Sequence, residues 1–409
     1  MTLFCLILYA LGQTATFSSI NVGMMVFWHV WWPFIPFLIL FFGNFWCSIC
    51  PYSAIAVALN RLLPYRLCAW EWLERNGLVV SLLTYLAVIG LDAIFGLEQN
   101  PLFSLMFIGS MFALMITMVI LFGYKAFCLA GCPVGLFVRV YRRFSFFRLT
   151  GKEEVCGKCR RTSWEQAKPL FGGKNTEETA KKKDWRHRVE CLKRCKSHSV
   201  QLTLQKPCSD DGHRTTTLLE DFAPAIVLMA LFISVMLKSS YSIQLFDLAS
   251  KLIPLSFSTV ILGMILAGCL FFAVVHIGLY RLSARFVPWG QPLFLLQLRS
   301  LVPLLISFHI ALVLDEIQGI SPLGQVISSL SFLQTSMPTA GTLLYASYGI
   351  MIIGSIGTFV SSYVMMRTER RLGSLYTFNL PATLLVFLVA GGYSFVCFAI
   401  FQIMQTIAC

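Results

Sequence analysis

Long apolar stretches recur along the chain, and their spacing predicts a polytopic membrane protein built from helices. Stretches of this length cross the hydrocarbon core of a bilayer as helices. We expect an all-α fold with about eight full transmembrane helices, near residues 24–46, 78–97, 102–124, 218–238, 256–280, 300–318, 341–366 and 380–405. An apolar stretch at residues 3–11 gives a ninth helix if it is part of one. No Lys or Arg precedes it, so it fits a cleaved signal peptide poorly.

The composition agrees with this pattern. Of the 409 residues, 57% are hydrophobic and only 12% are charged. A soluble domain carries about 25% charged residues. The chain therefore has too few charged side chains to cover a surface that faces water.

The basic residues gather on one side of the predicted membrane. Of the 32 Lys and Arg residues, 30 fall in the loops of that side, and only Lys238 and Lys251 fall on the other. Lys and Arg accumulate in cytoplasmic loops, so we assign this side to the cytoplasm and the chain to the cytoplasmic, or inner, membrane. The net charge of +13 is then a topology signal, and we expect membrane lipid rather than nucleic acid as a partner.

The predicted spans divide the chain into three regions. Residues 1–150 form a membrane domain, residues 151–217 form the main water-soluble stretch, and residues 218–409 form a five-helix membrane domain whose role the sequence does not indicate. A soluble stretch of this size cannot bury a large core, and such stretches often rely on bound metal. We therefore expect a small cytoplasmic segment that is stabilised by what its cysteines bind.

One motif occurs twice in the first region. The sequence GNFWCSICP at residues 43–51 ends one inward-running span, and GYKAFCLAGCP at residues 123–133 ends another. In each copy an apolar stretch follows the proline and leads to basic residues. Two copies with the same orientation at the same depth predict a parallel structural repeat.

Eight of the 14 cysteines form four close pairs, all on the cytoplasmic side. The pairs are Cys47/Cys50, Cys128/Cys132, Cys156/Cys159 and Cys191/Cys195. The cytosol keeps thiols reduced, so such pairs are metal ligands more often than disulfides. The other six are isolated: four fit small buried hydrophobic residues, and two on the cytoplasmic side could replace one of the eight. They are Cys5, Cys269, Cys397 and Cys409, and then Cys68 and Cys208.

Two kinds of metal site use paired cysteines. Zinc takes four thiolates, often from two short knuckles. A [4Fe–4S] cluster also takes four, and its sequence signature includes a cysteine followed by proline. Cys50 and Cys132 each precede a proline, and eight cysteines suffice for two clusters. The sequence therefore favours [4Fe–4S] clusters over zinc or over a chain without metal.

These motifs resemble those of the membrane-bound 4Fe-4S polyferredoxins (the NapH/NosR-like membrane ferredoxins), over roughly residues 1–210. The resemblance implies clusters at the cytoplasmic face and electron transfer between quinone, the clusters and a redox partner. It implies eight ligands, Cys47, Cys50, Cys128, Cys132, Cys156, Cys159, Cys191 and Cys195. The 31 residues between Cys159 and Cys191 differ from the compact spacing of ferredoxin domains. The cytoplasmic segment is thus expected to hold one cluster or to share in two.

We therefore expect an electron-transfer component of an oxidoreductase system. It would relay electrons between quinone or a cytoplasmic carrier and a partner oxidoreductase. The alternative is a transporter or a membrane assembly factor with a structural or sensory metal–thiolate site, because the resemblance leaves residues 218–409 unexplained.

Three histidines suggest further sites. His276 and His309 could hold a haem b axially, although hydrogen bonds between helices explain them equally well. His29 lies among tryptophans near the outer end of its span and could meet a quinone head group.

Overall fold

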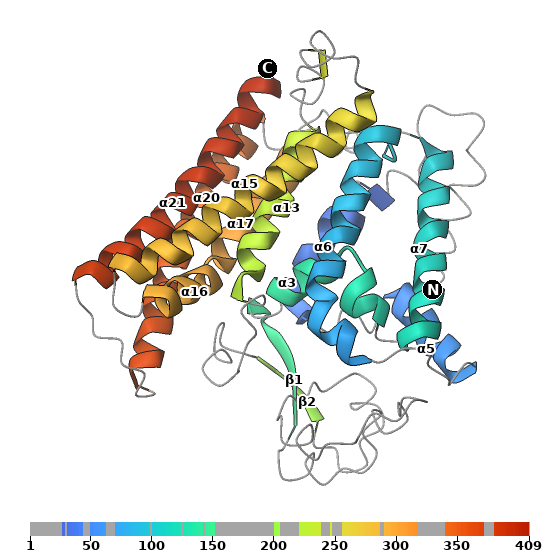
Figure 1. The fold of residues 1–409 in the computed structure, drawn as a ribbon, viewed down its shortest axis with the longest axis horizontal. Helices are drawn as coiled ribbons and strands as arrows, with labels where there is room; N and C mark the ends of the chain where they lie inside the picture. Colours follow the sequence, from blue (N-terminus) through green and yellow to red (C-terminus); the bar gives the residue numbers. More distant parts are fainter. Residues whose placement is uncertain are drawn as a thin grey trace. The chain divides into compact units, whose positions relative to one another are not determined.

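The computed structural model of the protein is mostly helical (Figure 1). It describes residues 27–28, 31–43, 50–62, 70–98, 100–123, 126–141, 144–151, 200–204, 221–238, 246–247, 256–286, 290–317, 340–371 and 380–408. The elements in chain order are α3 (Trp32–Phe42), α5 (Pro51–Leu62), α6 (Trp70–Phe95), α7 (Pro101–Phe122), the π-helical turn η3 (Phe127–Gly131), α8 (Gly135–Tyr141), β1 (Phe147–Gly151), β2 (Val200–Leu204), α13 (Ala223–Lys238), α15 (Phe257–Phe286), α16 (Gly290–Ser300), α17 (Val302–Ile317), α20 (Ala340–Arg371) and α21 (Leu380–Ala408).

Within these residues, five helical stretches are long and apolar enough to cross a membrane: Asn76–Phe95, Pro101–Phe122, Phe257–Arg285, Leu293–Leu314 and Leu344–Met365. Residues 223–237 and 388–402 form shorter apolar helices. The span expected at residues 24–46 is described only in part. The helices therefore support a membrane protein, and the count of eight or nine full spans stays a prediction.

The helix expected at residues 300–318 begins earlier than hydropathy predicts. α16 and α17 follow one another, and their apolar span starts at Leu293. Arg299 is one of the 30 basic residues that the sequence assigns to loops of the cytoplasmic side, but it lies in α16. Its Nε and Nη2 donate hydrogen bonds to Oδ1 of Asp221, at 2.8 and 2.6 Å. This ion pair neutralises the charge of Arg299, which had excluded the segment from the span predicted by hydropathy.

The chain divides into two compact units. The first, unit 1, comprises Met1–Phe4, Ile35–Thr84 and Met106–Pro207. The second, unit 2, comprises Cys5–Phe34, Tyr85–Leu105 and Cys208–Cys409.

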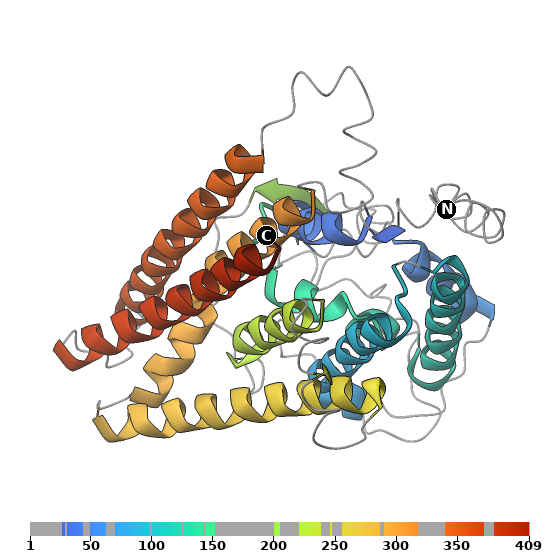
Figure 2. The ribbon, with the colours of Figure 1, turned by 90° about the horizontal axis from the view of Figure 1, so that it is seen from above.

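Unit 2 is a helix bundle in which α17 and α20 pack most extensively. Glycines make this close approach feasible, because a Cβ on Gly354 would overlap the side chain of Ser307. One on Gly357 would lie 3.1 Å from Pro303. Seen from above in Figure 2, α15 runs along one edge of the bundle.

Unit 1 contains a two-stranded antiparallel sheet that the all-α expectation missed. β1 pairs with β2 so that Phe147 lies opposite Leu204 and Gly151 opposite Val200. Both strands alternate apolar and polar residues, the period-2 pattern that favours a strand. The sheet joins the two ends of residues 152–199, which are outside the described residues and carry four of the predicted ligands.

Candidate metal centre

The two Cys-Pro motifs begin with the same backbone feature. α3 ends at Gly43 with φ of 54°, and α7 ends at Gly123 with φ of 95°. Positive φ is the usual end of a helix and favours glycine, since it costs other residues energy. At Gly43 a Cβ would also lie 2.8 Å from Oγ of Ser145. Each motif therefore leaves its helix through a glycine-specific turn, as the sequence repeat predicts.

The prolines fix the backbone after each second cysteine. Pro51 is the first residue of α5, and the carbonyl of Cys50 accepts the N–H of Ala54 at 3.0 Å. Proline is well suited to this position, because its missing N–H has no helical partner there. Cys132 is extended, with φ of −82° and ψ of 124°. A following proline disfavours the helical conformation, so Pro133 explains this break.

The sulfurs of Cys50 and Cys132 accept hydrogen bonds at matching offsets. Backbone N–H groups of Tyr52 and Ser53 donate to Cys50. Those of Val134 and Gly135 donate to Cys132. In both motifs the donors are the second and third residues after the cysteine, where helix N-termini have N–H groups without helical partners. The backbone donors around the second cysteine are therefore alike in the two motifs, and the parallel structural repeat stays a prediction.

The second motif is held in a buried π-helical turn. The N–H of Cys132 donates to the carbonyl of Phe127 at 2.7 Å, which closes η3. Ala126 and Ala130 pack against Leu73 of α6, and all three are fully buried. Single π-helical turns occur frequently at functional sites. Small side chains here let the turn lie close to α6.

The structure brings cysteines of the two motifs together in unit 1. The thiol of Cys132 interacts electrostatically with those of Cys128 and Cys50. Burial raises the pKa of Cys132 above its ordinary value, and the neighbouring thiols raise it further. Burial also raises the pKa of Cys50, against the opposing effect of its backbone hydrogen bonds. Such thiols deprotonate readily only when a bound cation offsets the charge, as a metal centre does.

Tyr52 lies between the two motifs, and sequence analysis missed it. Its ring stacks on Phe112 of α7 at 4.5 Å and on Phe127 of η3 at 5.5 Å. Burial raises the pKa of its phenol, with further contributions from Cys50 and Cys132. Tyr52 therefore packs the first motif onto the second. Its position two residues after Cys50 was the one signal in the sequence.

The chain can pass close to the carbonyl of Cys128 because Gly135 lacks a side chain. A Cβ on Gly135 would lie 2.9 Å from the carbonyl oxygen of Cys128 and 3.8 Å from Cβ of Cys132. The donor set consists of soft thiol sulfurs, which suit zinc and iron–sulfur clusters. The described residues of the site thus fit a thiolate-bound metal centre.

The base of the β-sheet lies beside the chain that leads to Cys47. The N–H of Phe146 donates to the carbonyl of Leu40 at 3.0 Å. The rings of Phe42 and Phe147 stack at 6.2 Å. The stretch that carries the four cytoplasmic cysteines leaves β1 at Gly151 and returns to β2 at Val200, which is the end of the sheet away from this contact.

Five of the eight predicted ligands lie outside the described residues: Cys47, Cys156, Cys159, Cys191 and Cys195. Across the described ranges, no group of three or more His, Cys, Asp or Glu side chains is arranged to hold a single metal ion. Of the isolated cysteines, Cys397 is fully buried, as expected. Cys269 is half-buried.

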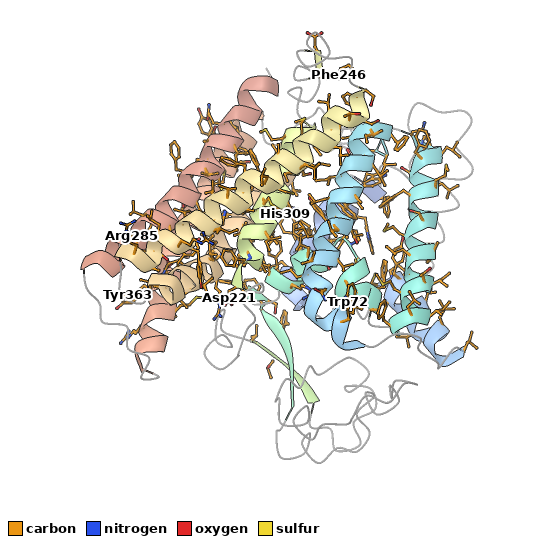
Figure 3. All side chains as sticks on the ribbon, in the orientation of Figure 1. Trp72, Asp221, Phe246, Arg285, His309 and Tyr363 are labelled. Atoms are coloured by element: carbon orange, nitrogen blue, oxygen red, sulfur yellow. The ribbon has the colours of Figure 1, made fainter. Side chains whose placement is uncertain are left out.

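His276 uses both ring nitrogens within unit 2. Its Nδ1 lies 2.8 Å from the carbonyl of Phe272, and its Nε2 pairs with the hydroxyl of Tyr393. His276 could bind haem iron through Nε2 only if the hydrogen bond between Nε2 and the Tyr393 hydroxyl were broken. His309 lies in α17, and Figure 3 shows it within the bundle. His29 lies outside the described residues.

These features are those of a helical membrane protein in which cysteines of two Cys-Pro motifs interact. A family model for a 4Fe-4S binding domain matches residues 24–67 and 103–150. The first stretch contains Cys47 and Cys50, and the second contains Cys128 and Cys132. The match supports an iron–sulfur, ferredoxin-like family, binding of a [4Fe–4S] cluster and a role in electron transfer. No curated protein and no solved structure matches the chain.

Proposed function

We propose that the protein is a membrane electron-transfer component of the NapH/NosR-like polyferredoxin type. Cys47, Cys50, Cys128 and Cys132 hold one [4Fe–4S] cluster at the cytoplasmic membrane surface. A second cluster is held by the cysteines of the cytoplasmic segment: Cys156, Cys159, Cys191 and Cys195. A bound cluster supplies one-electron transfer, and the protein determines its burial, position and potential.

The observation that carries this proposal is the electrostatic interaction of the Cys132 thiol with those of Cys50 and Cys128, which links the two motifs within unit 1. Two of these sulfurs accept backbone hydrogen bonds at matching offsets. Hydrogen bonds to cluster sulfurs are one of the means by which a protein adjusts reduction potential. The 4Fe-4S match covers the same two motifs, which favours a cluster over zinc.

The β-sheet supports a second cluster that is built from both cysteine pairs of the cytoplasmic segment. Cys156 follows Gly151 by five residues, and Cys195 precedes Val200 by five. Five residues of chain span at most about 17 Å. Both cysteines are therefore tethered to the same end of the sheet, the end at which Gly151 pairs with Val200.

The proposed electron partners follow from the membrane position. Quinone would exchange electrons from within the bilayer, and a cytoplasmic carrier or partner oxidoreductase from the basic face. Most Lys and Arg residues lie in the loops that we assign to the cytoplasm. A positive surface attracts acidic redox partners and accelerates their association.

The test is purification without oxygen, followed by absorbance, iron and acid-labile sulfide analysis. We expect a brown protein with broad absorbance near 400 nm. Substituting Cys132→Ser should remove about half of the iron, because one of two clusters loses a ligand. Cys397→Ser is the control, since Cys397 is also a free cysteine but is buried in unit 2.

A colourless protein with stoichiometric zinc would refute the cluster and leave the transporter or assembly-factor alternative. Equal iron in Cys132→Ser and the unsubstituted protein would show that Cys132 is not a ligand. Equal losses in Cys132→Ser and Cys397→Ser would mean that the loss reflects damage to the fold.

A further inference from the structure

α15 presents a long apolar face that the described residues of unit 2 leave exposed. Leu266, Leu270 and Val274 follow one another at intervals of four residues and are 60%, 66% and 62% exposed. In Figure 2 the helix lies at an edge of the bundle. Residues four apart lie on one side of a helix, so these side chains form a continuous strip. Such a strip in a membrane span faces hydrocarbon.

Two arginines continue this outward surface where the apolar strip ends. Ile277, Arg281 and Arg285 are spaced by four residues, and all three side chains are exposed. Figure 3 shows Arg285 at the end of the helix. α15 contains no acidic residue. Its surface therefore changes from apolar to cationic within about two turns.

The two arginines differ from Arg299 on the neighbouring helix α16. Arg299 forms an ion pair with Asp221 and is mostly buried. Among the described residues, no acidic side chain pairs with Arg281 or Arg285. Their guanidinium groups are therefore open to an anionic group at the membrane surface.

Gly278 leaves the helix surface open beside the arginines. A Cβ built on Gly278 would meet no atom within 4 Å. It lies three residues before Arg281, about one helical turn away. Between the apolar strip and the arginines, the surface of α15 at Gly278 is thus open to a bulky group.

We propose that this face of α15 binds an anionic phospholipid. The acyl chains lie along Leu266, Leu270 and Val274, and the phosphate binds between Arg281 and Arg285. Arginine binds phosphate strongly because its planar group donates paired hydrogen bonds. A phospholipid carries apolar chains and a negatively charged phosphate in one molecule, and these match the apolar strip and the two arginines along α15. A second protein would have to place an acidic residue at the same depth.

The test is lipid binding to the full-length protein in mild detergent, measured by native mass spectrometry. After removal of co-purified lipid, the protein is titrated with phosphatidylglycerol and, separately, with phosphatidylcholine. We expect tighter binding of phosphatidylglycerol. Arg281→Gln with Arg285→Gln should weaken that binding at least tenfold, at about fivefold for each arginine, and leave phosphatidylcholine unchanged.

The matched control is Arg367→Gln, which removes one exposed positive charge from α20 instead. It should change phosphatidylglycerol binding less than twofold. An equal loss in Arg367→Gln and in Arg281→Gln alone would show that only total charge matters, and would overturn the site. Unchanged binding in the double variant would also overturn it. So would concentration-dependent dimers that exclude the lipid, because a second copy would then cover this face.

Arg281 and Arg285 are exposed, so their substitution should leave the fold intact. Retention volume in size-exclusion chromatography and helical circular dichroism should match the unsubstituted protein. If the double variant aggregates, Arg281→Lys with Arg285→Lys provides the second measurement. It keeps the charge and should retain phosphatidylglycerol binding within about fivefold.

Discussion

Gly135 determines how closely the chain can turn beside the second motif. We predict that Gly135→Ala lowers the iron content and destabilises unit 1 by about 1–3 kcal/mol, because its Cβ would lie 2.9 Å from the carbonyl of Cys128. The measurements are iron per chain and thermal unfolding. Gly109→Ala in α7 is the control: its Cβ meets nothing within 4 Å, and it should leave the iron unchanged. Normal iron in Gly135→Ala would show that the turn adapts.

At the scale of residues, sequence patterns predict ligands better than they predict their surroundings. The cysteine pairs, the prolines and the two glycines can be read directly from the repeat. The donors to the sulfurs are backbone groups, which have no sequence signature of their own. Tyr52 matters because α5 packs against α7 and η3, and that contact joins segments far apart in the sequence. No local pattern contains this information.

At the scale of elements, an ion pair joins the α16 segment to the residue that precedes α13. We predict that Asp221→Asn destabilises unit 2 by about 3 kcal/mol, because Arg299 would remain charged and mostly buried without its counter-ion. Thermal unfolding in detergent measures the effect. Asp221→Asn with Arg299→Gln should recover much of the stability, since no lone charge is left. An unchanged melting temperature in the single variant would contradict this account.

The elements that sequence analysis misjudged share a physical cause. Hydropathy treats each residue alone, so it excluded Arg299 from a helix in which Asp221 neutralises it. The strands β1 and β2 pair across residues 152–199, and their short alternating patterns are weak signals beside long apolar helices. Five spans were predictable because length and apolarity alone determine them.

At the scale of the whole molecule, the sheet makes residues 152–199 an insertion with adjacent ends. We predict that replacing them with an Asn-Gly turn leaves unit 1 folded, since Gly151 and Val200 already face each other. About half of the iron should remain, from the cluster at the membrane edge. Iron analysis and size-exclusion chromatography measure this. Serine at all four cytoplasmic cysteines is the length-matched control, and loss of all iron in both variants would show that the segment completes the first site.

Sequence patterns do not predict the division of the chain into two units. Apolar spans and charged loops give the order and direction of helices, but packing between distant helices depends on shape. Helix α6 illustrates this, because residues up to Thr84 cluster with unit 1 and those from Tyr85 with unit 2. The division into 1–150, 151–217 and 218–409 therefore stays a prediction of organisation along the chain.

The matching hydrogen bonds to Cys50 and Cys132 have a consequence for how this chain can vary. The donors are main-chain groups, so substitution of Ser53 or Val134 by most residues leaves them in place. Proline is the exception, because it has no N–H to donate. These hydrogen bonds can thus persist while the side chains around the two cysteines diverge.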